Sequence, residues 1–244
     1  MSLFPDRIQN TVLSVFLALG FGATTASAGL IDPGLEIDWW VDGVYAGKLT
    51  PSGVYNEPLG WWNYAGSAFH APTGVSLSFN LNGDPDPLIT GNLTVENLLL
   101  ASVDITLVVI LPIAPTIPGA TIMTGSAALT LTSDVGGGSF STLDGSPVWQ
   151  GLIDGVSAGA AASLFSDPFA MVNPGFGSLS DSANFGPVAG PAALDSIGIE
   201  INFSLTQLDQ ASITSVFHVV AIPGPGVIAL LAVGAVGTRR RRRR

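Results

Sequence analysis

Apolar and polar residues alternate strictly along several segments of the chain. In VSLSFNLN, residues 75–82, large apolar residues alternate with serine and asparagine, and IGIEINFSL, residues 197–205, repeats the pattern. Because successive side chains of a strand point to opposite faces, each segment predicts a strand with one buried and one solvent-facing side. Further apolar segments bounded by Gly, Pro, Asn or Asp predict strands near 88–96, 101–111, 120–132, 138–143, 148–157 and 211–220.

Turn residues complete an all-β pattern. IDWWVDGVYAGKL, residues 37–49, predicts two strands around an Asp42-Gly43 turn. Residues 158–165 are the one segment between the two chain ends for which we expect a short helix. The body, residues 29–221, is therefore expected to be a single antiparallel β-sandwich, with a jelly roll as one candidate arrangement.

The first 28 residues have the features of a secretory signal peptide. An apolar run from Thr11 to Gly22 follows Arg7, and Ala26-Ser27-Ala28 supplies the small side chains of a cleavage site. We expect residues 1–28 to form an apolar signal helix that a signal peptidase removes, so that the exported chain begins at Gly29.

Residues 222–244 form a second apolar and charged segment. Pro223, Gly224, Pro225 and Gly226 precede an uncharged run, 227–238, that is expected to be a short membrane helix. As a helix this run rises about 18 Å, and about 25 Å when counted from Ile222, against a hydrocarbon core of about 30 Å. The arginine cluster then stops transfer on the cytoplasmic side; it comprises Arg239, Arg240, Arg241, Arg242, Arg243 and Arg244.

This three-part tail resembles the PEP-CTERM sorting signal of Gram-negative bacteria, which combines a Pro-x-Pro motif, a short apolar helix and a terminal arginine cluster. Gly224 stands where that family usually has glutamate. The resemblance implies transient insertion in the inner membrane, processing by an exosortase-like enzyme, and delivery to the cell surface or extracellular matrix. It also implies association with extracellular polysaccharide. A permanently membrane-anchored ectodomain is the alternative.

Charge divides the body from its ends. Between residues 29 and 222 the chain has a single basic residue, Lys48, against 17 acidic ones, for a formal charge of −16. Nucleic acid and anionic membrane surfaces would repel such a body, so nucleic acid is not an expected partner. The chain has no cysteine, which excludes disulfides.

One short motif suggests hydrolysis. Residues 155–159, GVSAG, match the G-x-S-x-G pattern around Ser157, and a serine hydrolase also needs a histidine, of which the chain has His70 and His218. The surrounding strands lack the strand–helix alternation of such enzymes, and glycine and serine are abundant. We therefore expect no catalytic residue, with a secreted hydrolase acting on glycans or esters as the alternative function.

Asp84 and Asp86 form the best candidate metal site. Both lie in NGDPDP, residues 82–87, and calcium prefers carboxylate and carbonyl oxygens gathered in a loop. The alternative is a polar turn between two strands, and no other cofactor is expected. Two distant histidines and no cysteine exclude a zinc site of the usual kind.

Two pairs of consecutive tryptophans, Trp39-Trp40 and Trp61-Trp62, suggest sugar binding. If both pairs lie in strands, one indole of each pair enters the core and the other faces outward. We predict Trp40 and Trp62 as the outward residues, available to stack on a sugar ring, with core packing as the alternative. The sequence thus predicts an exported, non-catalytic surface or matrix protein.

Overall fold

A computed structural model describes residues 31–222 of the chain. The predicted signal peptide with its cleavage site at Gly29, the Pro223–Gly226 motif, the apolar run and the arginine cluster lie outside the described residues. Within residues 31–222, no helix is long and apolar enough to cross a membrane. The body is all-β, as predicted.

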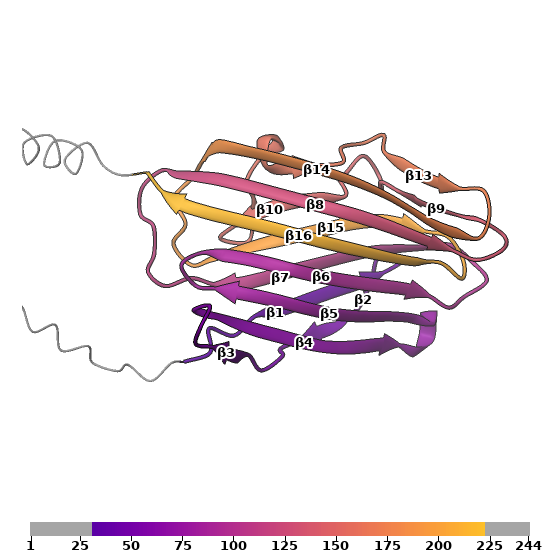
Figure 1. Ribbon diagram of the computed structural model, residues 1–244, viewed down its shortest axis with the longest axis horizontal. Helices are drawn as coiled ribbons and strands as arrows, with labels where there is room; N and C mark the ends of the chain where they lie inside the picture. Colours follow the sequence, from indigo (N-terminus) through magenta and orange to yellow (C-terminus); the bar gives the residue numbers. More distant parts are fainter. Residues whose placement is uncertain (1–30, 223–244) are drawn as a thin grey trace, which may run out of the picture. The chain divides into compact units, whose positions relative to one another are not determined.

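Two antiparallel sheets form the body (Figure 1). Sheet A has the strand order β11-β10-β15-β7-β1-β2, with β9, β12 and β13 paired beside this path; sheet B has the order β14-β8-β16-β6-β5-β4-β3. The strands of sheet A are β1 (Glu36–Val41), β2 (Val44–Leu49), β7 (Val103–Pro112), β9 (Gly138–Ser141), β10 (Trp149–Ile153), β11 (Val156–Ser157), β12 (Ser163–Leu164), β13 (Ala170–Asn173) and β15 (Ser196–Leu205). The strands of sheet B are β3 (Val54–Asn56), β4 (Trp61–His70), β5 (Val75–Asp84), β6 (Leu88–Asn97), β8 (Thr121–Ser133), β14 (Gly177–Gly190) and β16 (Gln210–Ala221).

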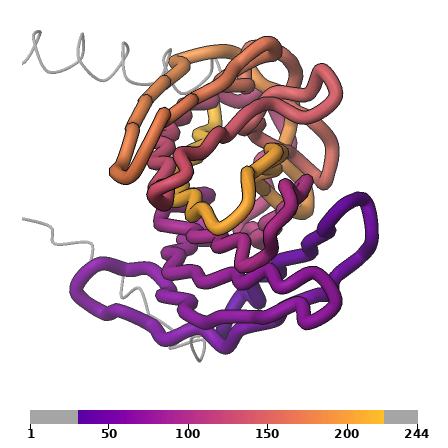
Figure 2. Tube along the Cα trace, turned by 90° about the vertical axis from the view of Figure 1, so that its right-hand side faces the viewer, coloured from indigo at the N-terminus to yellow at the C-terminus, as the bar shows by residue number. Residues whose placement is uncertain are grey.

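The inner faces of the two sheets pack into one core, which makes the body a β-sandwich. β7 alternates between buried and partly exposed residues, and so do β8 and β16 of the opposite sheet, whereas β15 also buries Gly198 and Asn202 on its outer side. Glycines mark where the layers approach most closely. A Cβ at Gly151 of β10 would lie 2.7 Å from the Phe217 ring of β16, and one at Gly83 of β5 would lie 3.0 Å from Leu111 of β7. Figure 2 shows the early strands of both sheets, indigo to violet, at one edge of the sandwich and the late strands toward the other edge.

The predicted strands are present with small changes at their ends. The segment 148–157 is a hairpin, β10 and β11, in place of one strand, because Asp154 and Gly155 both adopt positive φ (52° and 73°). The expected helix at 158–165 is reduced to one 3-10 turn, η2 (Ala160–Ala162), after Gly159 at φ 97°. The only other helical turn among the described residues is η1 (Ala71–Thr73).

The predicted Asp42-Gly43 turn joins β1 and β2. Both residues have positive φ, 51° and 71°, which is the geometry of a type I′ hairpin. Farther along the hairpin the register shifts between Trp39 and Trp40, so that Trp39 is opposite Gly47 while Trp40 is opposite Tyr45. This bulge decides which side chains share a face in the site described below.

Two carboxylates anchor loops to the sandwich. Asp32 accepts hydrogen bonds from the amides of Gly34 (2.9 Å) and Gly53 (2.6 Å) and from the Tyr64 hydroxyl (2.8 Å). Burial raises the pKa of Asp32, but these three donors outweigh it and leave the pKa below its usual value. Burial, and next the hydrogen bond to Asp32, raise the pKa of Tyr64.

The second anchor is Asp154, at the tip of the β10–β11 hairpin. Its carboxylate accepts bonds from the amides of Leu194, Asp195 and Ser196 at 2.8–3.1 Å, and so fixes the start of β15. Burial again raises its pKa, and the amide donors outweigh burial and lower it overall.

Candidate functional site

The outer face of sheet A gathers an aromatic pair, an ion pair and a chain of polar side chains. Cross-strand register places their residues in neighbouring rows, since strands alternate their side chains between faces. We call this surface the Trp40 face, formed by Glu36, Asp38, Trp40, Tyr45, Lys48, Thr106, Gln150, Glu200 and Asn202.

Trp40 and Tyr45 form its aromatic part. Their ring centroids are 5.4 Å apart at an interplanar angle of 58°, and Tyr45 is 52% exposed. The Asp42-Gly43 turn pairs Trp40 with Tyr45 and so places the two rings on one face, and the bulge farther along the ladder brings Lys48 opposite Asp38 on that face. The Tyr45 hydroxyl donates to Asp38 Oδ1 at 2.7 Å, and this hydrogen bond is the main reason why the pKa of Tyr45 is raised. The bond holds the phenol beside the indole.

Lys48 is placed next to this pair. Its Nζ lies 2.7 Å from Glu36 Oε2, and this contact is the main cause of the raised pKa of Lys48. Both side chains are about two-fifths exposed, at 41% and 40%. The single cation of the body therefore lies on the Trp40 face, beside its aromatic residues.

A chain of hydrogen bonds crosses from β7 to β11. Thr106 Oγ1 donates to Asn202 Oδ1 (2.8 Å), and Asn202 Nδ2 donates to Glu200 Oε1 (2.9 Å). Gln150 Nε2 donates to Glu200 Oε2 (2.5 Å) and Gln150 Oε1 accepts from Ser157 Oγ (3.1 Å). Asn202 is buried at 6% exposure, and its bonds fix the rotamers of the partly exposed Thr106 and Glu200 before any ligand arrives.

An apolar row closes one side of the face. Gly198 lies between Ile110 of β7 and Leu152 of β10 in the register of sheet A. A Cβ at Gly198 would lie 2.6 Å from the Val109 carbonyl oxygen and 2.7 Å from Ile110 Cδ1, so the neighbouring aliphatic side chains occupy the space above the glycine. Leu152 is 3% exposed although it belongs to the outer face.

The face has the components of a carbohydrate-binding surface. An accessible indole can stack on the apolar side of a sugar ring, and fixed amides and carboxylates can pair with its hydroxyls. Asp38 and Glu200 lie two strands apart, a separation of about 10 Å at the usual strand spacing. One oligosaccharide could therefore contact the aromatic pair and the polar chain together.

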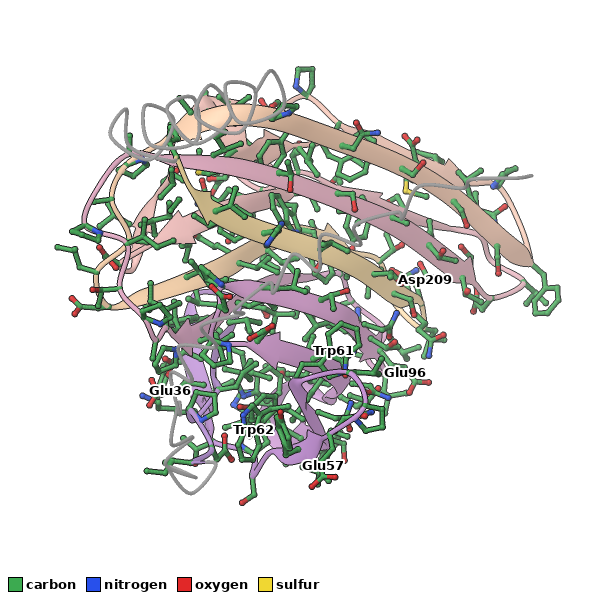
Figure 3. The ribbon with its side chains drawn as sticks, turned by 60° about the vertical axis from the view of Figure 1, so that its left-hand side comes forward. Glu36, Glu57, Trp61, Trp62, Glu96 and Asp209 are labelled. Atoms are coloured by element: carbon green, nitrogen blue, oxygen red, sulfur yellow. The ribbon has the colours of Figure 1, made fainter. Side chains whose placement is uncertain are left out.

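The prediction for the second tryptophan pair is wrong. Trp62 is 8% exposed and its ring lies 5.3 Å from that of Tyr55, whereas Trp61 is partly exposed on the outer face of sheet B (Figure 3). The inward direction of Trp62 follows from Tyr64, two residues on, which is fully buried and bonded to Asp32. Trp40 does face outward, while Trp39 is buried at 2% exposure.

Asp84 and Asp86 form a turn. Asp84 Oδ1 accepts the amide of Asp86 at 3.0 Å, between β5 and β6. Among residues 31–222 no group of three or more His, Asp or Glu side chains is placed to hold a metal ion. The calcium site therefore stays a prediction, and among the described residues no third His, Asp or Glu side chain joins Asp84 and Asp86.

Ser157 is not placed as a catalytic nucleophile. It lies in the two-residue strand β11 on an exposed hairpin, where a nucleophile elbow would require a strand-to-helix turn. Its hydroxyl donates to Gln150 in sheet A. His218 belongs to β16 of sheet B, paired with Leu88 and Thr124, and His70 bonds Thr73.

Comparison with known proteins identifies no family. No protein-family model and no curated protein matches the chain. Among solved structures, TmCBM61 in complex with β-1,4-galactotriose is similar over 75% of this chain and 88% of that one, with 9% identity and a TM-score of 0.27. The K1 cleaved adhesin domain of Lys-gingipain from Porphyromonas gingivalis covers 70% of this chain and 94% of its own, with 9% identity and a TM-score of 0.25. Similarities at this level assign neither fold nor function.

Most of the Trp40 face could not be found from sequence alone. Trp40 was predicted as an outward residue, and Tyr45 lies beside it because the Asp42-Gly43 turn pairs the two strands. Glu200 and Gln150 are 50 residues apart, and Thr106 and Asn202 are 96 apart. These residues lie side by side because β15 pairs with β7 and β10. The apolar and polar pattern of a single strand does not predict which strands pair.

Proposed function

We propose that the chain is an exported, non-catalytic surface or extracellular-matrix protein that binds polysaccharide through the Trp40 face. The observation that carries the proposal is the accessible Trp40–Tyr45 pair, bordered by hydrogen-bonded carboxylates and amides. Aromatic residues flanked by fixed polar groups are a suitable arrangement for sugar recognition.

The carboxylates of this face support binding over catalysis. Glu36 is paired with Lys48, Asp38 accepts the Tyr45 hydroxyl, and Glu200 accepts two amide donors. A glycoside hydrolase needs one carboxyl group that holds a proton for the leaving oxygen. Carboxylates that each accept a donor are better suited to positioning hydroxyl groups than to delivering a proton.

The two chain ends supply the proposed address. We propose removal of residues 1–28 by signal peptidase, insertion of 227–238 in the inner membrane, and processing by an exosortase-like enzyme near Pro223-Gly224-Pro225. The last strand, β16, ends at Ala221, and the Ile222 amide donates to Ala120 O at 3.2 Å. Pro223 has no N–H to extend this pairing. The folded body thus reaches to the first residue of the proposed sorting segment.

A glycan array tests the binding function. Full-length chain in mild detergent should bind a subset of neutral oligosaccharides, and Trp40→Ala should lose about tenfold or more in affinity. Phe176→Ala is the matched control, since it removes an exposed aromatic ring from a loop outside the Trp40 face. Equal binding by wild type and Trp40→Ala would contradict the proposed site.

Mass spectrometry of the surface-localised protein tests the address separately. The expected mature chain begins at Gly29 and lacks Arg239–Arg244. An intact arginine cluster on the surface protein would favour the permanently anchored ectodomain.

A further inference from the structure

The outer face of sheet B carries a continuous array of uncharged hydroxyl and amide side chains. The registers of β4, β5, β6, β16, β8 and β14 align three central rows across the sheet. In order from β4 to β14 the rows are Ser67, Ser78, Thr94, Ser212, Thr130 and Ser180; Ala65, Asn80, Asn92, Thr214, Ala128 and Ser182; and Asn63, Asn82, Thr90, Val216, Ser126 and Asn184. We call these rows the hydroxyl lattice; only Ala65, Ala128 and Val216 interrupt it.

The lattice is neutral on a strongly acidic body. None of the 17 acidic residues between positions 29 and 222 lies in the three rows. The nearest carboxylates on this face, Glu96 and Asp84, lie in the flanking rows opposite Ser76 and Leu88. Soluble proteins commonly keep such faces hydrated with charged residues. Here the charge lies outside the three rows, so the rows can contact a neutral partner without burying a carboxylate of their own.

Members of the lattice hold one another in place. Thr94 Oγ1 lies 2.9 Å from Ser212 Oγ, Thr130 Oγ1 lies 2.9 Å from Ser180 Oγ, and Asn92 Nδ2 donates to Thr214 Oγ1 at 3.1 Å. A hydroxyl has one donor and two acceptor sites, so each such pair retains capacity for an outside partner. The hydrogen-bonded rotamers reduce the entropy lost on binding.

An aromatic residue borders the lattice. Trp61 lies beside Asn63 at the start of β4 and is partly exposed (Figure 3). Next to it a groove of about 560 Å³ is lined by Val54, Tyr55, Asn56, Glu57, Pro58 and Asn63. Asn63 is shared between this groove and the lattice, where its Nδ2 donates to Asn80 (2.7 Å) and Asn82 (3.1 Å).

From these features we infer that the hydroxyl lattice is a second binding surface, whose partner is a neutral, hydroxyl-rich polysaccharide. Such a polymer offers alternating donors and acceptors and no charge, as the lattice does. A second copy of the chain is less suited to this face, because a stable protein interface needs an apolar centre and Val216 is the only large apolar residue in the rows. Nucleic acid is not an expected partner, because neither lysine nor arginine lies in the rows.

The two surfaces would give the body two sides that bind polysaccharide. The biological meaning of this inference rests on the proposed function, but its physical basis is independent, because the Trp40 face and the lattice lie on opposite sheets. A protein with binding surfaces on opposite sides can hold two polymer chains together. Binding at one surface requires no change in the conformation of the other.

Co-sedimentation of the full-length chain with amorphous cellulose, insoluble neutral β-glucan and agarose tests the lattice. We expect binding to at least one of these neutral polymers at both low and high salt, because screening does not weaken uncharged contacts. The double variant Asn80→Glu/Thr214→Glu, at two exposed positions of the middle row, should lose about tenfold in affinity. Ser166→Glu, in an exposed loop, is the control for the added charge.

Trp40→Ala separates this inference from the proposed function. If the lattice binds, the double variant should lose most of the wild-type co-sedimentation. Trp40→Ala should retain at least half of the part that the double variant loses. No co-sedimentation of wild type with any of the three polymers, or equal binding by wild type and double variant, would overturn the second surface. In either case Trp40-dependent binding on the glycan array would leave the proposed function standing.

Discussion

On the outer face of sheet A, individual charged and aromatic side chains are fixed by specific partners, whereas on the outer face of sheet B small uncharged side chains repeat in rows. The carboxylates of Glu36, Asp38 and Glu200 each contact a specific donor: Lys48, Tyr45 and Gln150, respectively. The lattice, in contrast, uses pairs of equivalent hydroxyls such as Thr130 and Ser180. The first arrangement suits one oligosaccharide in one orientation, and the second suits an extended polymer with little register preference.

The largest expected effect tests how tightly each face is packed. Gly198→Val should destabilise the protein by about 3 kcal/mol, because its side chain would meet the Val109 carbonyl and Ile110. Ala128→Val on sheet B, exposed between Thr214 and Ser182, should change stability by less than about 0.5 kcal/mol. Urea unfolding followed by circular dichroism measures both, and similar midpoints for the two variants would break the comparison.

The next effect concerns selectivity. Tyr45→Phe keeps the aromatic ring but removes the bond to Asp38, so affinity for the array-selected oligosaccharide should fall about threefold to tenfold. Binding to the neutral polymers through the lattice should stay unchanged. A parallel loss on both ligands would show that the two surfaces are not separate.

Acid should weaken the anchor of each sheet. Asp154 and Asp32 have pKa values below 3.8 in the folded protein, so their stabilisation is fully present above that pH and is lost as pH falls through the lowered folded values. Thermal unfolding should show a steeper fall in melting temperature below about pH 4 for wild type than for Asp154→Asn or Asp32→Asn. A wild-type slope that both variants reproduce would mean that other carboxylates dominate acid unfolding.

The smallest expected effect concerns the one cation. Lys48→Met removes an exposed ion pair with Glu36, and such pairs contribute little to stability. The urea midpoint should not change measurably, and oligosaccharide affinity should change by less than about twofold if the ligand is neutral. A large loss of affinity would instead identify Lys48 as a contact to an anionic sugar.

Alternation of apolar and polar residues predicted β5, which buries one face, and β15, although Gly198 and Asn202 on the outer side of β15 are buried as well. It missed β14, an edge strand rich in Ser and Gly whose two faces are both largely exposed. It also could not fix the direction of Trp61 and Trp62, since aromatic residues occur at adjacent positions and the inward side is decided by the contact of Tyr64 with Asp32, 32 residues away. The hydroxyl lattice is defined by the registers of six paired strands, and the sequence of any one strand does not predict it.

The most direct test of the central claim is the indole N–H spectrum of the full-length chain, which has 5 tryptophans, during titration with the oligosaccharide selected on the array. The account predicts that the Trp40 signal shifts saturably while the signal of Trp149, which is fully buried, does not move. An unchanged Trp40 signal at a ligand concentration that saturates binding would contradict it.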